Sequence, residues 1–258
     1  MAEPAAERPP RVEILGVTGL PEVREGDDLA ALIVEAAARQ GTPLQDGDVL
    51  VVTQKVVSKA EGRLVDLRTV TPSAEALDLA ARLERDPRLV EVILRESVRV
   101  VRAVPGVLIT ETRHGFVCAS AAVDASNVPG EEVVCLLPED PDASADRIRE
   151  GVRRLAGVDL AVLISDTFGR PWREGQTNVA VGVSGLLPLA DYTGQHDPFG
   201  YELKVTKLAV ADELASASEL VMGKTTGVPV AVIRGYRYPA GEGRYRHLLR
   251  DPERDLFR

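Results

Sequence analysis

Two aspartates, each close to an apolar run, are the residues of this sequence best suited to chemistry. Asp166 follows a short unbroken apolar run that is typical of a buried strand. Because Gly169 and Pro171 disfavour a regular continuation, we expect the strand to stop near Thr167, with a carboxylate and a hydroxyl at its C-terminal end. Asp124 is expected in a loop between two other apolar runs. Carboxylate and hydroxyl oxygens are ligands that Mg2+ shares with phosphate groups, so these residues indicate a metal site that handles phosphate.

Cationic side chains elsewhere in the chain would suit an anionic substrate at such a site. Arginine forks match phosphate or carboxylate groups, and lysines at a strand exit suit anion binding. Two bare carboxylates about 4 Å apart repel by roughly 4 kcal/mol at an effective dielectric near 20, and a divalent cation reverses that sign. An alternative interpretation, an Asx-turn at the strand end with solvated loop charges, fits the same residues. The cations in question are Lys55, Lys59, Arg170, Arg173 and Lys224.

Composition and charge describe an ordinary globular chain of 258 residues, 45% apolar and 28% charged. The net charge of -9 and the lack of a long basic stripe argue against nucleic-acid binding. No apolar run approaches the length of a membrane span, and residues 1–10 resemble neither a signal peptide nor an anchor. Cys118 and Cys135 lie in apolar runs and are interpreted as core residues rather than as a disulfide or metal framework. We therefore expect a cytoplasmic protein that acts on a small molecule.

Familiar catalytic motifs are either absent from the sequence or lie between the wrong secondary-structure elements. Residues 223–226, Gly-Lys-Thr-Thr, resemble part of a phosphate-binding loop, but the glycine that this motif needs is replaced by Ser218. A helix is expected before these residues and a strand after them, which reverses the order of a phosphate-binding loop. The sequence has no HExxH, paired CxxC or GxSxG, which argues against zinc proteases and α/β hydrolases. His114 is predicted to be a turn residue.

Hydrophobic periodicity predicts intermixed strands and helices. Asp27 or Asp28 should cap the first helix, and the last helix should end at Gly223. Residues 191–200 form a long polar loop of the kind that is usually functional or mobile. The expected strands are 12–17, 49–53, 107–112, 115–119, 132–137, 160–164, 179–185, 203–208 and 229–233. The expected helices are 29–36, 72–85, 86–96, 145–156 (capped by Ser144) and 210–223.

Seven short motifs occur together in one order along the chain. They are Gly-Leu-Pro-Glu at 19–22, Gly-Asp-Asp-Leu at 26–29, Asp-Gly-Asp-Val at 46–49, Ser-Lys-Ala-Glu-Gly-Arg at 58–63, Asp-Ala-Ser-Asn at 124–127, Asp-Thr-Phe-Gly-Arg at 166–170 and Val-Ala-Asp-Glu at 210–213. With this set of motifs the chain resembles the coenzyme F-420-0:gamma-glutamyl ligase family from about residue 12 to residue 234. Each motif is weak by itself, but the ordered set is specific.

The resemblance implies a GTP-dependent ligase that adds L-glutamate, and further gamma-linked glutamates in some cases, to the deazaflavin precursor coenzyme F-420-0. It implies an α+β fold with mixed sheets in two interwoven lobes, neither a Rossmann nor a P-loop fold. Residues 11–258 would form the ligase domain, and residues 1–10 a disordered tail. The family also implies an intertwined homodimer, Mg2+ or Mn2+ at two sites and stimulation by K+. In actinobacterial relatives this domain is fused to a flavin-binding reductase, and residues 248–257 resemble the junction.

Motif matching also assigns residues to roles. Asp124 and Asp166 would be catalytic metal ligands, Thr167 would hold a second metal, and Lys59 would neutralise phosphate. Two positions depart from the family: Gln54 replaces a serine that contacts GTP, and Lys224 replaces an acidic ligand of the second metal found in some members. Either that metal is held differently here, or Lys224 takes over part of its task. The implied GTP contacts are Leu20, Pro21, Glu22, Val23, Gln54, Lys59, Asn127, Met222, Gly223, Lys224, Thr225, Thr226, Gly227 and Val228.

The implied reaction passes through an acyl phosphate, which the amine of glutamate then attacks. Arg170 or Arg173 would hold a carboxylate of glutamate or the phosphodiester of the precursor. His196 and Asp197 are weak candidates for the general base. The rival interpretations are a metal-dependent nucleotide phosphohydrolase, which would release phosphate without glutamate, and a non-catalytic deazaflavin or nucleotide carrier.

Overall fold

A five-stranded mixed sheet organises the protein, whose computed structural model describes residues 9–128 and 130–255. The strand order is β1-β12-β2-β8-β9. β2 and β8 run parallel, and the other neighbouring pairs are antiparallel. The predicted α+β fold with mixed sheets is therefore confirmed, whereas most of the predicted tail lies outside the described residues. The strands are β1 Glu13–Val17, β2 Val49–Thr53, β8 Ala161–Arg170, β9 Arg173–Ser184 and β12 Val230–Arg234.

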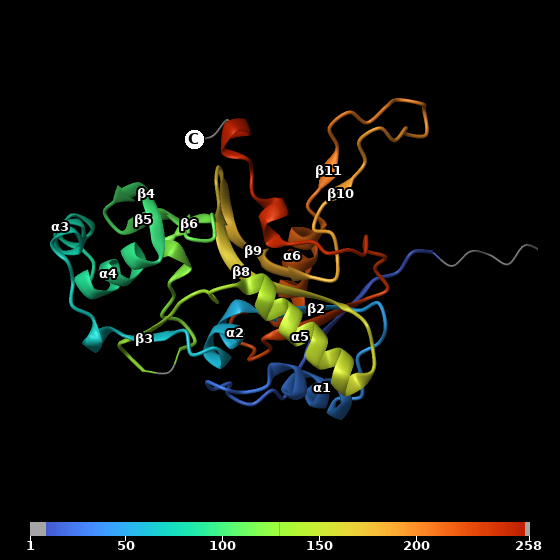
Figure 1. Ribbon diagram of the computed structural model, residues 1–258, viewed down its shortest axis with the longest axis horizontal. Helices are drawn as coiled ribbons and strands as arrows, with labels where there is room; N and C mark the ends of the chain where they lie inside the picture. Colours follow the sequence, from blue (N-terminus) through green and yellow to red (C-terminus); the bar gives the residue numbers. More distant parts are fainter. Residues whose placement is uncertain (1–8, 129, 256–258) are drawn as a thin grey trace, which may run out of the picture.

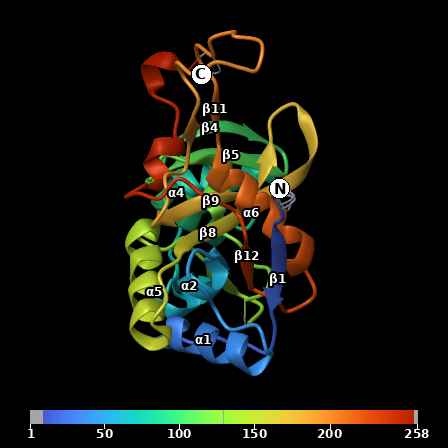
Figure 2. The same ribbon diagram turned by 90° about the vertical axis from the view of Figure 1, so that its right-hand side faces the viewer.

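Helices cover both faces of this sheet (Figure 2). α1 (Leu29–Arg39) and α5 (Pro141–Ala156) lie against each other on one side, and α6 (Val210–Met222) lies on the other. β2, β12 and the first half of β8 are almost entirely buried, which explains why their sequences are apolar runs. α2 (Gln54–Ala60) begins at the residue after β2, so the lysines at this strand exit are arranged on a helix.

The crossing of α1 and α5 depends on one glycine. A Cβ atom added at Gly151 would lie 2.5 Å from the Cβ atom of Ala30. We predict that Gly151→Ala destabilises the protein by about 1–3 kcal/mol through overpacking, although alanine favours an isolated helix. Urea denaturation measures this change, and Glu150→Ala on the same helix is the control. An increase in the free energy of unfolding for Gly151→Ala would contradict this prediction, because it would show that α1 and α5 can move apart without cost.

A second hydrophobic core is built by residues 67–136 alone. Its elements lie to one side of the central sheet (Figure 1). A short ladder of β3 with β7 connects this part with the segment that leads into α5. The elements are β3 Leu64–Asp66, α3 Ala74–Leu83, α4 Pro87–Arg95, β4 Ser97–Val104, β5 Val107–Thr112, β6 Val117–Ala119 and β7 Val133–Cys135, with the 3-10 turns η1 Leu67–Thr69 and η2 Ser120–Ala122.

The prediction that the strand before Asp166 stops near Thr167 is wrong. β8 continues to Arg170, because β9 pairs with it beyond the point where β2 ends. Pro171 and Trp172 form the tip of this hairpin, and Trp172 has a φ of 59°. The glycine and proline signals therefore mark a hairpin turn and not the end of the buried strand.

Smaller differences concern the ends of elements. Asp140, not Ser144, caps α5, because its side chain accepts the amide hydrogen of Ala143. Of the expected strand 203–208 only β11 (Lys207–Leu208) forms, paired with β10 (Ala190–Asp191), and the segment between them projects from the body (Figure 1). The caps expected at Asp28 and Gly223 are confirmed. The part of the chain that is described contains no helix long and apolar enough to cross a membrane.

Candidate active site

Asp166 lies where β8 loses its parallel partner. The β2–β8 ladder ends at the pair of Thr53 with Ser165, one residue before Asp166. One carboxylate oxygen of Asp166 accepts the amide hydrogen of Thr167 at 2.8 Å. Burial, with a smaller contribution from the charge of Asp124, raises the pKa of Asp166 to about 7. This is a partly buried acid with few donors, the kind of group that a bound cation would satisfy.

Asp124 reaches the same place from the other part of the chain. Its backbone bridges to Cys135, and its carboxylate pairs with Lys55 at 2.6 Å. Burial acts to raise the pKa of Asp124, but hydrogen bonds from Lys55 and Ser126 outweigh it and hold the pKa below its usual value. Lys55 also lowers the pKa of Asp166 through its charge. The two acids therefore share the field of one lysine.

Helix α2 carries both lysines of the site. Lys55 and Lys59 are four residues apart and lie on one face of the helix. Lys59 is 8% exposed and pairs with Glu22 at 2.6 Å, so the predicted GTP-contacting loop 20–23 lies against it. Gln54, another assigned GTP contact, is only 1% exposed and accepts a hydrogen bond from Ser58.

The segment after α6 reaches Thr167. Lys224 Nζ donates to Thr167 Oγ1 at 2.5 Å and pairs with Glu219 at 3.2 Å. Thr167 Oγ1 in turn donates to Asn178 Oδ1 at 2.7 Å, and Asn178 Nδ2 donates to Glu219 at 2.9 Å. Residues 223–226 do lie between a helix and a following strand, in the order that excludes a phosphate-binding loop. Lys224 instead contributes its side-chain charge beside Thr167.

Sequence reasoning missed Asn178 and Glu219 and gave Lys55 no specific contact. Asn178 is 2% exposed and stands opposite Thr167 in the β8–β9 pairing. In the sequence, Asn178 was recognisable only as a polar residue at the start of an apolar run. Glu219 lies on α6 with no motif around it, so only the packing of α6 on β9 connects it with the site.

We predict that Asn178→Ala lowers the free energy of unfolding by about 1–3 kcal/mol. The substitution removes the acceptor for Thr167 and the donor to Glu219 inside a buried network. Chemical denaturation measures the loss, and Gln176→Ala at an exposed position of the same strand is the matched control. Equal stability of the two variants would argue that the network contributes nothing to the fold.

Other assigned residues lie apart from this network. Asn127 is exposed with a φ of 55°, three residues beyond Asp124. Arg170 and Arg173 face each other at the tip of the β8–β9 hairpin, and Arg170 donates to backbone carbonyl groups of the turn. His196 and Asp197 are in the projecting segment between β10 and β11. A substrate bound at the aspartates would contact these residues only with those of its parts that extend away from the site.

The donors at the site fit a metal that is shared with a ligand. Within residues 9–128 and 130–255, no group of three or more His, Cys, Asp or Glu side chains could hold an ion by itself. Asp124 and Asp166 supply two carboxylates, which is the usual protein contribution to a Mg2+ ion that also binds phosphate. The hydroxyl of Thr167 is already engaged by Lys224 and Asn178. The arrangement thus fits one divalent ion better than two.

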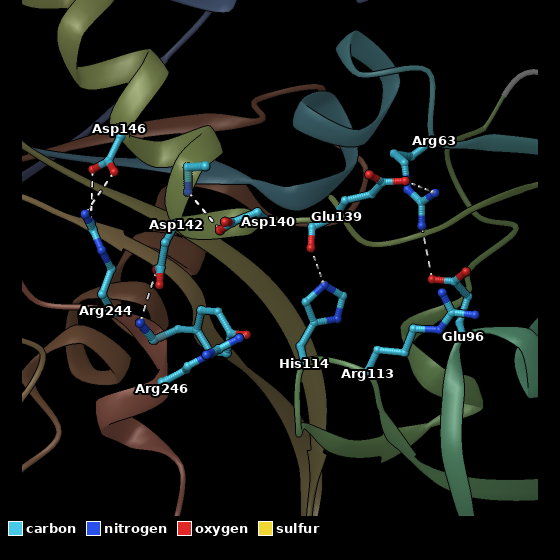
Figure 3. A pocket seen from close by; sticks show the side chains of 12 residues that line it. Arg63, Glu96, Arg113, His114, Glu139, Asp140, Asp142, Asp146, Arg244 and Arg246 are labelled. Carbon is cyan, nitrogen blue, oxygen red and sulfur yellow. Dashed lines mark hydrogen bonds and ion pairs between the residues drawn. The ribbon is translucent and has the colours of Figure 1, made fainter.

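A charged cavity of about 660 Å³ lies beyond the site (Figure 3). His114, in the predicted turn between β5 and β6, points its Nε2 atom at the carbonyl oxygens of Pro138 and Glu139 (3.0 and 3.1 Å). Arg63 pairs with Glu96 and Glu139, and Arg244 pairs with Asp146. The acidic and basic side chains that line this cavity largely pair with one another. We therefore interpret the lining as a structural ion-pair network.

The comparison with known proteins is consistent with this geometry. The family model for F420-0:Gamma-glutamyl ligase matches residues 18–235. The chain belongs to the F420-0:gamma-glutamyl ligase family. The matched region includes nearly all residues of both hydrophobic cores and the segments that carry Asp124, Asp166 and Lys224.

Curated proteins extend this similarity. The coenzyme F420:L-glutamate ligase of Methanothermobacter thermautotrophicus is 48% identical over 250 residues, which cover 96% of this chain and 99% of the relative. The enzyme of the same name from Methanopyrus kandleri is 50% identical over 242 residues, 92% of this chain and 94% of the relative. That of Methanocaldococcus jannaschii is 43% identical over 251 residues, 96% and 97% of the two chains. Members of the F420-0:gamma-glutamyl ligase family therefore align with this chain over nearly their whole length.

Proposed function

We propose that this protein is a GTP-dependent ligase that joins L-glutamate to coenzyme F420-0. The observation that carries the proposal is that Lys55, at the exit of β2 beside β8, pairs with Asp124 from a separate part of the chain and also acts on Asp166 through its charge. The relatives that bear the name coenzyme F420:L-glutamate ligase supply the substrates. A ligase of this kind needs a site that neutralises a nucleoside triphosphate and activates a carboxylate.

Asp124 and Asp166 would hold a Mg2+ or Mn2+ ion. Such an ion, when bound, neutralises charge on phosphate oxygens during phosphoryl transfer. The fit is supported by the buried carboxylate of Asp166, which has a single backbone donor and a pKa raised by burial. We further propose that Lys224 supplies beside Thr167 part of the positive charge that a second metal supplies in some family members. The distance of 2.5 Å between Lys224 Nζ and Thr167 Oγ1 supports that role.

In the proposed reaction the terminal carboxylate of F420-0 attacks the γ-phosphorus of GTP, and GDP leaves. The amine of glutamate then attacks the acyl carbon, loses a proton and expels inorganic phosphate, so that an amide forms. Lys59 would balance the charge of the transferred phosphate, since it is buried and faces the loop 20–23. Burial around Asp166 would protect the acyl phosphate from water.

We also propose the other features that the family resemblance implies. They are a homodimer, stimulation by K+, a cytoplasmic location and cooperation with a flavin-dependent reductase domain. The first two are open to direct measurement, by sedimentation and by assay with K+ replaced by Na+.

One assay tests the proposed function. The protein is incubated with GTP, Mn2+, F420-0 and L-glutamate, and the product is analysed by mass spectrometry. We expect a gain of one or more glutamyl units and GDP release that depends on both acceptor and glutamate. Phosphate release without glutamate would support the phosphohydrolase, and ligand binding with no product would support a carrier.

A further inference from the structure

An apolar cavity opens beside the candidate active site. Its volume is about 630 Å³, within the range usual for small-molecule sites. Its lining includes Phe116 and Val117 at the start of β6, Phe168 from β8, and Leu248 and Leu249 from the C-terminal segment. Charged side chains also line it, namely Glu111, Asp212, Arg246, Arg250 and Asp251, but apolar surface predominates.

Aromatic rings form one wall of this cavity. Phe116 and Phe168 meet edge to face, with ring centroids 5.9 Å apart. Tyr245, which is 4% exposed, packs behind Phe116 at 5.0 Å and fixes its position. Phe168 is only partly buried, so one side of its ring remains open to a ligand. Such a wall favours a flat aromatic group, which gains offset or edge contacts in addition to apolar burial.

Two residues that line the cavity, Phe168 and Val179, are close neighbours of Asp166 in the β8–β9 pair. Asp166 and Phe168 are two residues apart on the same face of a regular stretch of the strand, about 7 Å along its axis. Val179, which also lines the cavity, is the direct cross-strand partner of Asp166 and therefore shares its face. Phe116, which directly precedes β6, packs against Phe168. A ligand in the cavity would thus have its open end at Asp166.

We infer that this cavity binds the tricyclic deazaflavin ring of the acceptor, with the acceptor's tail running along β8 towards Asp166. The inference rests on the proposed function, because that function supplies an acceptor with a planar ring at one end and the reacting carboxylate at the other. Arg246 lines the cavity, donates to the hydroxyl of Tyr245 at 3.4 Å and forms no ion pair among residues that the structure describes, so it is placed to meet the phosphodiester of the tail. The ring contacts would set acceptor affinity without taking part in the chemistry.

The test uses the fluorescence of the deazaflavin ring itself. The probe is the deazaflavin riboside that lacks the phosphodiester tail, titrated with the whole chain in the absence of GTP. Val117→Asp places a charge in the cavity from an exposed position and should weaken binding of the probe at least tenfold. Val107→Asp on the neighbouring strand, whose side chain is equally exposed at 43%, should leave binding unchanged. Phe168→Leu keeps the apolar volume, removes the ring and should weaken binding by several-fold.

The inference is overturned if Val117→Asp binds the probe as tightly as Val107→Asp, or if the unsubstituted protein does not bind the probe. Glutamylation of the full acceptor is measured in parallel. Normal product formation with no effect of Val117→Asp on acceptor affinity would remove the ring site and leave the proposed ligase intact. Ring binding at this cavity without any glutamylated product would remove the ligase and leave the ring site.

Discussion

Replacing Asp166 with asparagine should reduce ligation by on the order of a thousandfold or more. The substitution keeps the shape of the side chain but removes a charge that would bind the metal, and metal stabilisation of transferring phosphoryl groups contributes several kcal/mol. GDP release that depends on both acceptor and glutamate measures the effect. Asp78→Asn on α3 is the matched control, because Asp78 is exposed and forms only a loose pair with Arg82 at 3.8 Å. Turnover within a few-fold of normal in Asp166→Asn would remove the metal assignment.

The same substitution should stabilise the metal-free protein. In the absence of metal, Asp166 is a buried carboxyl close to Asp124, and both features disfavour its charge. Asparagine removes that cost, so we expect a gain of about 1–3 kcal/mol, or roughly 2–4 °C in Tm for each kcal/mol. Thermal unfolding with a chelator present measures it. A lower Tm than that of Asp78→Asn would mean that the charge of Asp166 is already well compensated by Lys55 and Lys224.

Lys59→Met should lower kcat/KM for GTP by about a hundredfold or more. Removing one partner of a desolvated charge contact costs about 2–5 kcal/mol, which corresponds to that range. The fold should tolerate the change, because methionine keeps the apolar stem and the abandoned partner Glu22 remains largely in solvent, with 65% of its side chain exposed. Steady-state kinetics with GTP as the varied substrate measures the effect, and Arg82→Met at an exposed position of α3 is the control.

The kinetic pattern separates binding from chemistry for Lys59. A rise in KM alone would indicate contact with GTP in its ground state, and an equal fall in kcat and kcat/KM would indicate a contact made in the transition state. Either pattern is compatible with phosphate neutralisation. Kinetics like those of Arg82→Met would contradict a role for Lys59 in GTP use.

Local patterns in the sequence predicted the elements that hold the site. The apolar runs before Gln54 and Ser165 are strands β2 and β8, and they lie next to each other in parallel. Lys55 and Lys59 therefore follow a buried strand, as their position in the sequence indicated. The expected cap at Asp28 and the helix end at Gly223 were also recognisable, because capping depends on residues within one turn.

Local sequence patterns could not predict the contacts between segments that are distant in the sequence. Lys55 and Asp124 are far apart in sequence, and the bridge of Asp124 to Cys135 together with the packing of β7 on α2 brings them together. The extension of β8 past Thr167 depends on pairing with β9, which overrides the turn signals at Gly169 and Pro171. Asn178 owes its place to the same pairing. The aromatic wall of the apolar cavity likewise combines β6, β8 and the C-terminal segment, which no local signal connects.

Binding of Mn2+ together with a non-hydrolysable GTP analogue tests the central claim most directly. Electron paramagnetic resonance counts free Mn2+ while the analogue is held at saturation. We expect the unsubstituted protein to bind Mn2+ tightly only when the analogue is present, and the double variant Asp124→Asn, Asp166→Asn to bind it at least about a hundredfold more weakly. Equal Mn2+ affinity in the two proteins would contradict the claim that carboxylates from two parts of the chain hold the ion on the nucleotide.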